Sequence, residues 1–114
     1  MAAAKYRLDS LTAICDRNGL QLDGPVSEIM PLEPFAAKWR AFGWEIVECD
    51  GHSVEEVADA LDRAAEVKDA PTLVLARTVK GKGVSFMEGR FEWHGKAPDD
   101  QQYRRAVAEV TASG

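Results

Sequence analysis

A polar turn follows the first apolar run of the chain and carries residues that could bind a hard cation. The run covers residues 11–15, and the turn covers residues 16–24, with the sequence DRNGLQLDG. The side-chain oxygen of Asn18 and a nearby backbone carbonyl could coordinate Mg²⁺, which proteins usually hold through one or two carboxylates together with phosphate oxygens. The same residues also fit an ordinary Asx turn, in which the asparagine bonds only to its own backbone. Spacing alone leaves both interpretations open.

Two histidines are the next candidates for chemistry. His94 lies between Trp93 and Gly95, in a loop rather than on an apolar helix face. Its neutral imidazole could donate or accept a proton near pH 7, whereas the alternative is a plain surface residue. His52 follows Asp50 and Gly51, and we expect it only to cap or orient the next helix.

Basic and sulfur-containing residues give weaker signals. Residues 80–83, with the sequence KGKG, suggest a phosphate cradle but lack the spacing of a P-loop, so we interpret Lys80 and Lys82 as solvated or as ion-pair partners of a neighbouring chain. Cys15 and Cys49 could form a redox pair or bind a metal. Because neither belongs to a CxxC motif, we expect two reduced core cysteines.

The elements that must position these residues alternate along the chain. Apolar runs predict strands at residues 11–15, 44–49 and 72–76. Helical periodicity follows each of them: a helix over residues 34–42, a second capped by Ser53 and Glu56, and a last one starting near Asp99 or Asp100. On the last helix we expect Tyr103, Val107 and Val110 to face inward.

This order predicts an α/β fold: a three-layer parallel sheet with covering helices. Ligands of such sheets bind beyond the carboxyl ends of the strands, and the glycine-bearing polar segments after all three predicted strands fall there. A sheet of three parallel strands also has two open edges, which favours pairing with further chain. We therefore interpret the chain as part of a larger sheet.

Composition sets the class of protein. The 114 residues suffice for one domain, and 19 Asp and Glu against 14 Lys and Arg give a net charge of −5. That balance argues against nucleic acid or an anionic membrane as partner. No apolar run reaches the length of a membrane span, and the first residues lack the apolar core of a secretory signal. We expect a cytoplasmic protein.

Taken together, five motifs resemble the transketolases. More closely, they resemble the amino-terminal subunit of split bacterial transketolases, in order and over essentially the whole chain. The motifs are DRNGLQLDG at 16–24, KWRAFGW at 38–44, DGH at 50–52, KGKGVSFM at 80–87 and WHG at 93–95.

The resemblance implies a partial thiamine diphosphate-binding fold, with residues 1–114 forming the later part of that domain as a single domain. It implies thiamine diphosphate and Mg²⁺ (or Ca²⁺) as cofactors, and transfer of a two-carbon ketol unit between sugar phosphates. Asn18 matches the family's metal-binding asparagine, and Leu20 matches the residue that gives its carbonyl to the same ion. Leu22 resembles the apolar residue beside the thiazolium ring. His94 resembles the catalytic loop histidine that reaches both the diphosphate and the substrate.

The sequence also departs from the family pattern. The Gly-Asp-Gly that opens the family's metal motif is absent, and with it the aspartate that balances most of the cation's charge. The departure implies either that this sequence is a fragment or that the gene is split inside the domain. In the second case the resemblance implies companion chains: one with the upstream Gly-Asp-Gly half, and a carboxy-terminal subunit. We expect this chain alone to be inactive.

Two other classes stay open at this point. One is a different thiamine enzyme, either a deoxyxylulose-phosphate synthase or the E1 component of a 2-oxoacid dehydrogenase. The other is a non-catalytic interaction subunit of the same fold.

Overall fold

The computed structural model describes residues 1–112, and the chain divides into two compact units. The first unit consists of Met1–Arg17 and Leu32–Thr78. The second consists of Asn18–Pro31 together with the described chain from Val79 onward.

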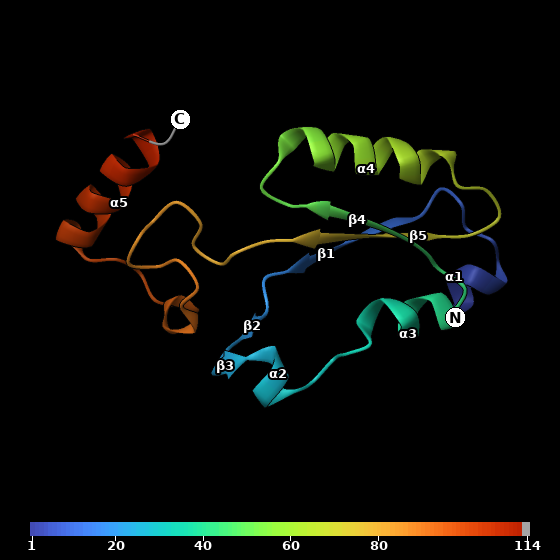
Figure 1. Cartoon of the computed structure of the whole chain (residues 1–114), viewed down its shortest axis with the longest axis horizontal. Helices are drawn as coiled ribbons and strands as arrows, with labels where there is room; N and C mark the ends of the chain where they lie inside the picture. Colours follow the sequence, from blue (N-terminus) through green and yellow to red (C-terminus); the bar gives the residue numbers. More distant parts are fainter. Residues whose placement is uncertain (113–114) are drawn as a thin grey trace. The chain divides into compact units, whose positions relative to one another are not determined.

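A parallel sheet of three strands forms the centre of the first unit (Figure 1). Its strands are β1 (Thr12–Arg17), β4 (Glu45–Asp50) and β5 (Thr72–Arg77), in the order β1-β5-β4. Both pairings with β5 are parallel and in register, so that Ile14, Val74 and Val47 lie side by side across the sheet. The three strands expected from the apolar runs are thereby confirmed, as is the parallel arrangement.

Helices cover both sides of this sheet. Figure 1 shows α4 (Val54–Glu66) on one side and α3 (Phe35–Ala41) with the short α1 (Ala2–Lys5) on the other. On the α4 side, Val57, Ala60 and Ala64 pack against buried residues of β4 and β5. The three layers predicted from the sequence are present.

The start of α4 follows the predicted cap with one change of partner. The Ser53 hydroxyl accepts a hydrogen bond from the Glu56 backbone N–H at 3.2 Å. In a complete capping box the Glu56 carboxylate would accept from the Ser53 N–H. Here it accepts from the Asp50 N–H at 2.7 Å, while the Ser53 N–H donates to the Asp50 carbonyl. The glutamate thus ties the carboxyl end of β4 to the helix.

The central strand of the sheet is buried, and β1 is an edge strand. Residues 72–76 of β5 are all buried, as a central parallel strand covered on both faces should be. Ile14 lies on the α4 side of β1 and is nevertheless 61% exposed, because α4 packs on β4 and β5. The α4 side of β1 is therefore left partly uncovered at Ile14.

The second unit begins with a compact hairpin and a helical turn. Strands β2 (Leu20–Gln21) and β3 (Gly24–Pro25) pair in antiparallel fashion, and α2 (Val26–Ile29) follows directly. Gly24 is buried, and a Cβ at this position would lie 3.5 Å from Ile29 Cδ1, so α2 packs closely on the hairpin.

The rest of the second unit is a loop, the 3₁₀ turn η1 (Phe91–Trp93) and the helix α5 (Asp100–Ala112). The start of α5 agrees with the sequence, since the Asp99 carboxylate accepts from the Gln102 N–H at 2.8 Å and the Gln102 side chain accepts from the Asp99 N–H at 3.0 Å.

The expectation that Tyr103, Val107 and Val110 face inward is wrong, because they are 61%, 44% and 53% exposed. Periodicity identifies the apolar face of a helix, but not whether any element of the same chain covers it. Within residues 1–112, no helix is long and apolar enough to cross a membrane.

Candidate functional site

The turn after β1 presents Asn18 as a polar, half-buried side chain. Its Oδ1 accepts a hydrogen bond from the Leu20 backbone N–H at 2.9 Å, and Gly19 between them has φ +74°. This is an Asx turn, one of the two arrangements that the sequence left open. A side-chain amide oxygen has a second lone pair, so the turn leaves one acceptor site of Asn18 for another ligand.

The Leu20 carbonyl is the second oxygen of interest in this turn. In the β2–β3 pairing, Leu20 stands opposite Pro25. The Val26 N–H donates to the Gly19 carbonyl at 2.9 Å, so the next pair, Leu20 and Pro25, is a non-hydrogen-bonded pair of the antiparallel ladder, and the Leu20 carbonyl points away from β3. Together, Asn18 and Leu20 offer two neutral oxygens of the type that Mg²⁺ and Ca²⁺ prefer.

Carboxylates are missing from this donor set. Across the described part of the chain, no group of three or more His, Cys, Asp and Glu side chains is placed to hold a metal ion. Since both hard cations bind tightly only with charged oxygen ligands, the residues fit part of a divalent site.

Leu22 stands just beyond β2, at the turn of the hairpin, and its side chain is 64% exposed. An exposed leucine at a hairpin turn contributes little to its own fold. It is available for apolar contact with a group that is not part of this unit.

His94 ends the 3₁₀ turn η1, and its backbone N–H donates to the Phe91 carbonyl at 2.9 Å. The residue is exposed. All four predicted site residues, Asn18, Leu20, Leu22 and His94, belong to the second unit.

The neighbour of His94 is firmly held. Trp93 donates its indole N–H to the Phe86 carbonyl at 2.9 Å, and the two rings meet edge to face with centroids 5.3 Å apart. The backbone on which His94 is mounted is therefore anchored on one side by a half-buried aromatic pair.

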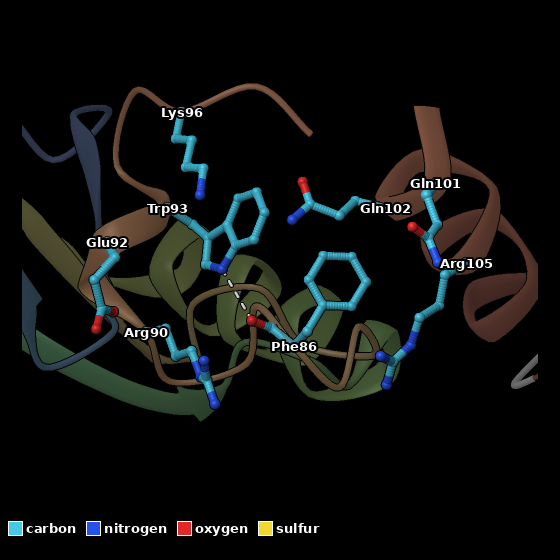
Figure 2. A pocket seen from close by; sticks show the side chains of 8 residues that line it. All are labelled: Phe86, Arg90, Glu92, Trp93, Lys96, Gln101, Gln102 and Arg105. Atoms are coloured by element: carbon cyan, nitrogen blue, oxygen red, sulfur yellow. Dashed lines mark hydrogen bonds between the residues drawn. The ribbon is translucent and has the colours of Figure 1, made fainter. Parts of the chain in front are cut away.

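A pocket of about 370 Å³ lies beside this aromatic pair (Figure 2). Its charged lining comes from Arg90, Glu92, Lys96 and Arg105, and none of them was singled out from the sequence. The alternation of basic and aromatic residues from 86 to 96 could have indicated this pocket from the sequence. Arg105, however, lies on α5, and only the folded structure brings it to the pocket.

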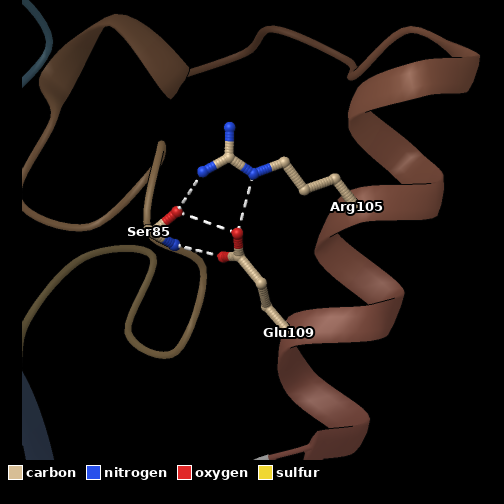
Figure 3. Close-up of polar contacts among 3 residues, drawn as sticks. All are labelled: Ser85, Arg105 and Glu109. Carbon is tan, nitrogen blue, oxygen red and sulfur yellow. Dashed lines mark hydrogen bonds and ion pairs between the residues drawn. The ribbon is translucent and has the colours of Figure 1, made fainter.

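Next to this pocket, a polar cluster ties α5 to the loop after β5 (Figure 3). The Ser85 N–H and hydroxyl both donate to the Glu109 carboxylate, which also accepts from Arg105 Nε at 2.8 Å. The Ser85 backbone N–H, and after it Arg105, hold the pKa of Glu109 below its ordinary value of 4.5. The cluster is a structural clamp within the second unit.

The remaining candidates have ordinary structural roles. Lys82 lies 3.3 Å from the Glu88 carboxylate, so its ion pair is within this chain rather than with a neighbouring one. Cys15 and Cys49 are both free thiols. Burial is the main cause that raises the pKa of each thiol, which favours the protonated form. Cys49 is buried as predicted, whereas Cys15 is only half-buried.

Comparison with known proteins settles the family. Residues 1–110 match the family described as transketolase, thiamine diphosphate binding domain. The chain belongs to the transketolase family. The five motifs of the sequence therefore pointed to the correct family.

Named relatives of this transketolase-family chain include subunits of specialised enzymes. It is 42% identical over 114 residues to the 6-deoxy-6-sulfo-D-fructose transketolase subunit of Clostridium sp. (strain MSTE9), covering 100% of this chain and 42% of that protein. It is 42% identical over 111 residues to an apulose-4-phosphate transketolase subunit of Phocaeicola vulgatus, covering 97% of this chain and 40% of that protein. The transketolase-family chain thus spans about two-fifths of the length of these relatives.

Solved structures confirm the fold. The crystal structure of transketolase from Campylobacter jejuni superposes with a TM-score of 0.87 at 28% identity, covering 96% of this chain and 17% of that one. The three-layer arrangement is accordingly a partial transketolase-type, thiamine diphosphate-binding α/β fold.

Proposed function

We propose that this chain is a subunit of a multi-chain, thiamine diphosphate-dependent transketolase, which transfers a two-carbon ketol unit between sugar phosphates. The observation that supports this most strongly is the match of residues 1–110 to the family's cofactor-binding domain. The names of the two subunit relatives add support for an assembly of several chains.

In this proposal, Asn18 and Leu20 bind the divalent cation, Mg²⁺ or Ca²⁺, that anchors the cofactor's diphosphate. Asn18 contributes its side-chain oxygen, and Leu20 contributes its carbonyl, which points away from β3 in a non-hydrogen-bonded pair. Asn18 and Leu20 carry no charge, and the described residues offer no acidic cluster; the proposal assigns the carboxylate to the Gly-Asp-Gly half of the family's cofactor motif, on a companion chain. A further companion is the carboxy-terminal subunit.

Leu22 and His94 act on the reacting side of the cofactor. When bound, thiamine diphosphate supplies the electron sink for breaking and forming the carbon–carbon bond. The exposed Leu22 side chain covers apolar ring surface and excludes water from it. The exposed His94 imidazole hydrogen-bonds to the diphosphate and to a substrate hydroxyl, which it orients and with which it can exchange a proton.

The direct test is a pull-down of the tagged chain from its own cells, followed by an assay of the eluate. We expect ketol transfer from a ketose phosphate in the presence of thiamine diphosphate and Mg²⁺, lost on chelation of the cation. Co-purified partners without this activity, or turnover of pyruvate instead of a ketose donor, would contradict the proposal.

A matched pair of variants tests the cation site. Asn18→Ala removes the side-chain oxygen that the proposal assigns to the cation, and it should weaken cofactor binding at limiting Mg²⁺ by about tenfold or more. Asp23→Ala, at the exposed turn of the same hairpin, should leave it unchanged. Equal cofactor affinity of the assemblies that contain Asn18→Ala and Asp23→Ala would show that Asn18 does not belong to the site.

A further inference from the structure

The pocket beside the Phe86–Trp93 pair has the size and lining of a ligand site. Its volume of about 370 Å³ falls in the range of pockets that hold small molecules. All of its lining residues lie between Phe86 and Arg105, so that one stretch of the second unit builds the whole cavity.

Positive charge dominates the lining. Arg90, Lys96 and Arg105 are opposed by one carboxylate, that of Glu92. The chain as a whole carries a net charge of −5, so this gathering of cations runs against its average. A pocket of this sign attracts anions and raises their local concentration.

Arg105 is held in position before any ligand arrives. Its Nε donates to Glu109 at 2.8 Å, and its Nη2 donates to the Ser85 hydroxyl at 2.7 Å (Figure 3). Its guanidinium also lies 5.2 Å from the Phe86 ring centroid. A guanidinium has further N–H donors beyond these. They can bind a ligand without the cost of first ordering the side chain.

The other two cationic side chains, those of Arg90 and Lys96, make fewer contacts. The Lys96 ammonium lies 4.7 Å from the Trp93 ring centroid and makes a cation–π contact. Among residues 1–112, no ion pair engages Arg90 or Lys96. Their charge is therefore available to an anionic ligand, whereas the charge of Arg105 is partly balanced by Glu109.

The centre of the pocket is apolar. Figure 2 shows the Phe86 and Trp93 rings facing the cavity, with the Gln102 amide directed toward the space between them. The Trp93 indole N–H already donates to the Phe86 carbonyl, so the rings offer contact surface rather than hydrogen bonds. A bare inorganic anion would leave this surface unused.

We propose that this pocket binds a small organic phosphate, a phosphate monoester carried on a compact apolar body. The cationic groups of the lining, those of Arg90, Lys96 and Arg105, attract the phosphate. The apolar body lies against Phe86 and Trp93, beside the Gln102 amide. The site does not depend on the proposed cation site at Asn18.

Titration of the full chain, labelled with ¹⁵N, tests the proposal. Phenyl phosphate is the probe, with inorganic phosphate and phenol as separate arms. The measured quantity is the NMR chemical shift of the Trp93 indole N–H, which is assigned by comparison with Trp93→Phe. The indole N–H signals of Trp39 and Trp44 in the first unit serve as internal controls. We expect saturable shifts of Trp93 with phenyl phosphate, and binding at least about tenfold weaker for either fragment.

Variants distinguish binding in this pocket from a general electrostatic attraction of the anion to the protein. Arg90→Gln and Lys96→Gln should each weaken phenyl phosphate by about tenfold. Arg104→Gln removes the same charge next to Arg105 but outside the lining, and it should bind like the parent. The unperturbed spectrum of each variant reports whether it is folded. Shifts that do not saturate, or that weaken equally in Arg104→Gln, would overturn the proposal.

Discussion

Ser85 and Glu109 lie 24 residues apart in sequence and are joined by two hydrogen bonds. The Ser85 backbone N–H donates to Glu109 Oε2 at 2.6 Å, and its hydroxyl donates to Oε1 at 2.9 Å. One carboxylate thus holds the loop after β5 against the second half of α5. Because the pocket is lined from both the loop and the helix, the same contact fixes the shape of the pocket.

Protonation of Glu109 should loosen this contact. Ser85 and Arg105 lower its pKa from 4.5 in the folded chain, so the folded state favours the ionised form. The stabilisation is complete above the pKa of the unfolded chain and is lost as pH falls through the lower, folded value. We expect Glu109→Gln to speed amide exchange at Ser85 near neutral pH, with the difference shrinking at acidic pH below 4.5. Glu66→Gln, on helix α4 of the first unit, should leave exchange at Ser85 unchanged, and a pH-independent effect of Glu109→Gln would contradict the argument.

Two glycines in the loop after β5 form a matched pair. Gly81 and Gly83 have φ of +70° and +87°, but a Cβ at Gly81 would come within 2.8 Å of the Met87 backbone, whereas one at Gly83 meets nothing within 4 Å. Gly83→Ala should cost about 1 kcal/mol in free energy of unfolding from the left-handed backbone alone. Gly81→Ala should cost about 1–3 kcal/mol more, because the added methyl also overpacks the loop. Chemical denaturation compares them, and equal losses would mean that the loop yields around Met87.

Thr72 carries a buried hydroxyl without a partner. The residue is 0% exposed, and within the described chain its Oγ1 makes no hydrogen bond. Thr72→Val exchanges the hydroxyl for a methyl of similar size, and it should raise the free energy of unfolding by about 1 kcal/mol. Thr12→Val, at the half-buried register partner on β1, should change it by less than about 0.5 kcal/mol. A less stable Thr72→Val protein in thermal or urea unfolding would show that the hydroxyl has a partner after all.

The sheet could be predicted because its signals are local. The apolar run from Thr72 to Ala76 is continuous, as a strand covered on both faces requires, and it proved to be the buried central strand. The cap of α4 could likewise be predicted from Ser53 and Glu56. What local pattern could not show was that Glu56 bonds to Asp50 instead of Ser53.

The pocket and the exposure of α5 could not be predicted for the same physical reason. Both depend on which residues the fold brings together from a distance. Arg105 reaches the Phe86 ring through the path of α5, and Tyr103 is exposed because a helix period does not specify a covering element. The residues of the proposed cation site were recognisable only through motif resemblance, since Asn18 by geometry alone is an Asx turn.

The role proposed for His94 can be tested against the other histidine of the chain. His94 is exposed at the end of η1, next to the anchored Trp93, so its removal should leave the fold and the recovery of companion chains intact. In the active assembly, His94→Ala should lower kcat by about a hundredfold, the lower range for loss of a group that exchanges a proton with substrate. His52→Ala, in the first unit between β4 and α4, should keep wild-type turnover. The measurement pairs steady-state kinetics with quantification of the co-purified chains. Wild-type turnover in His94→Ala, or a loss of activity that merely follows lost assembly, would remove the histidine from the reaction.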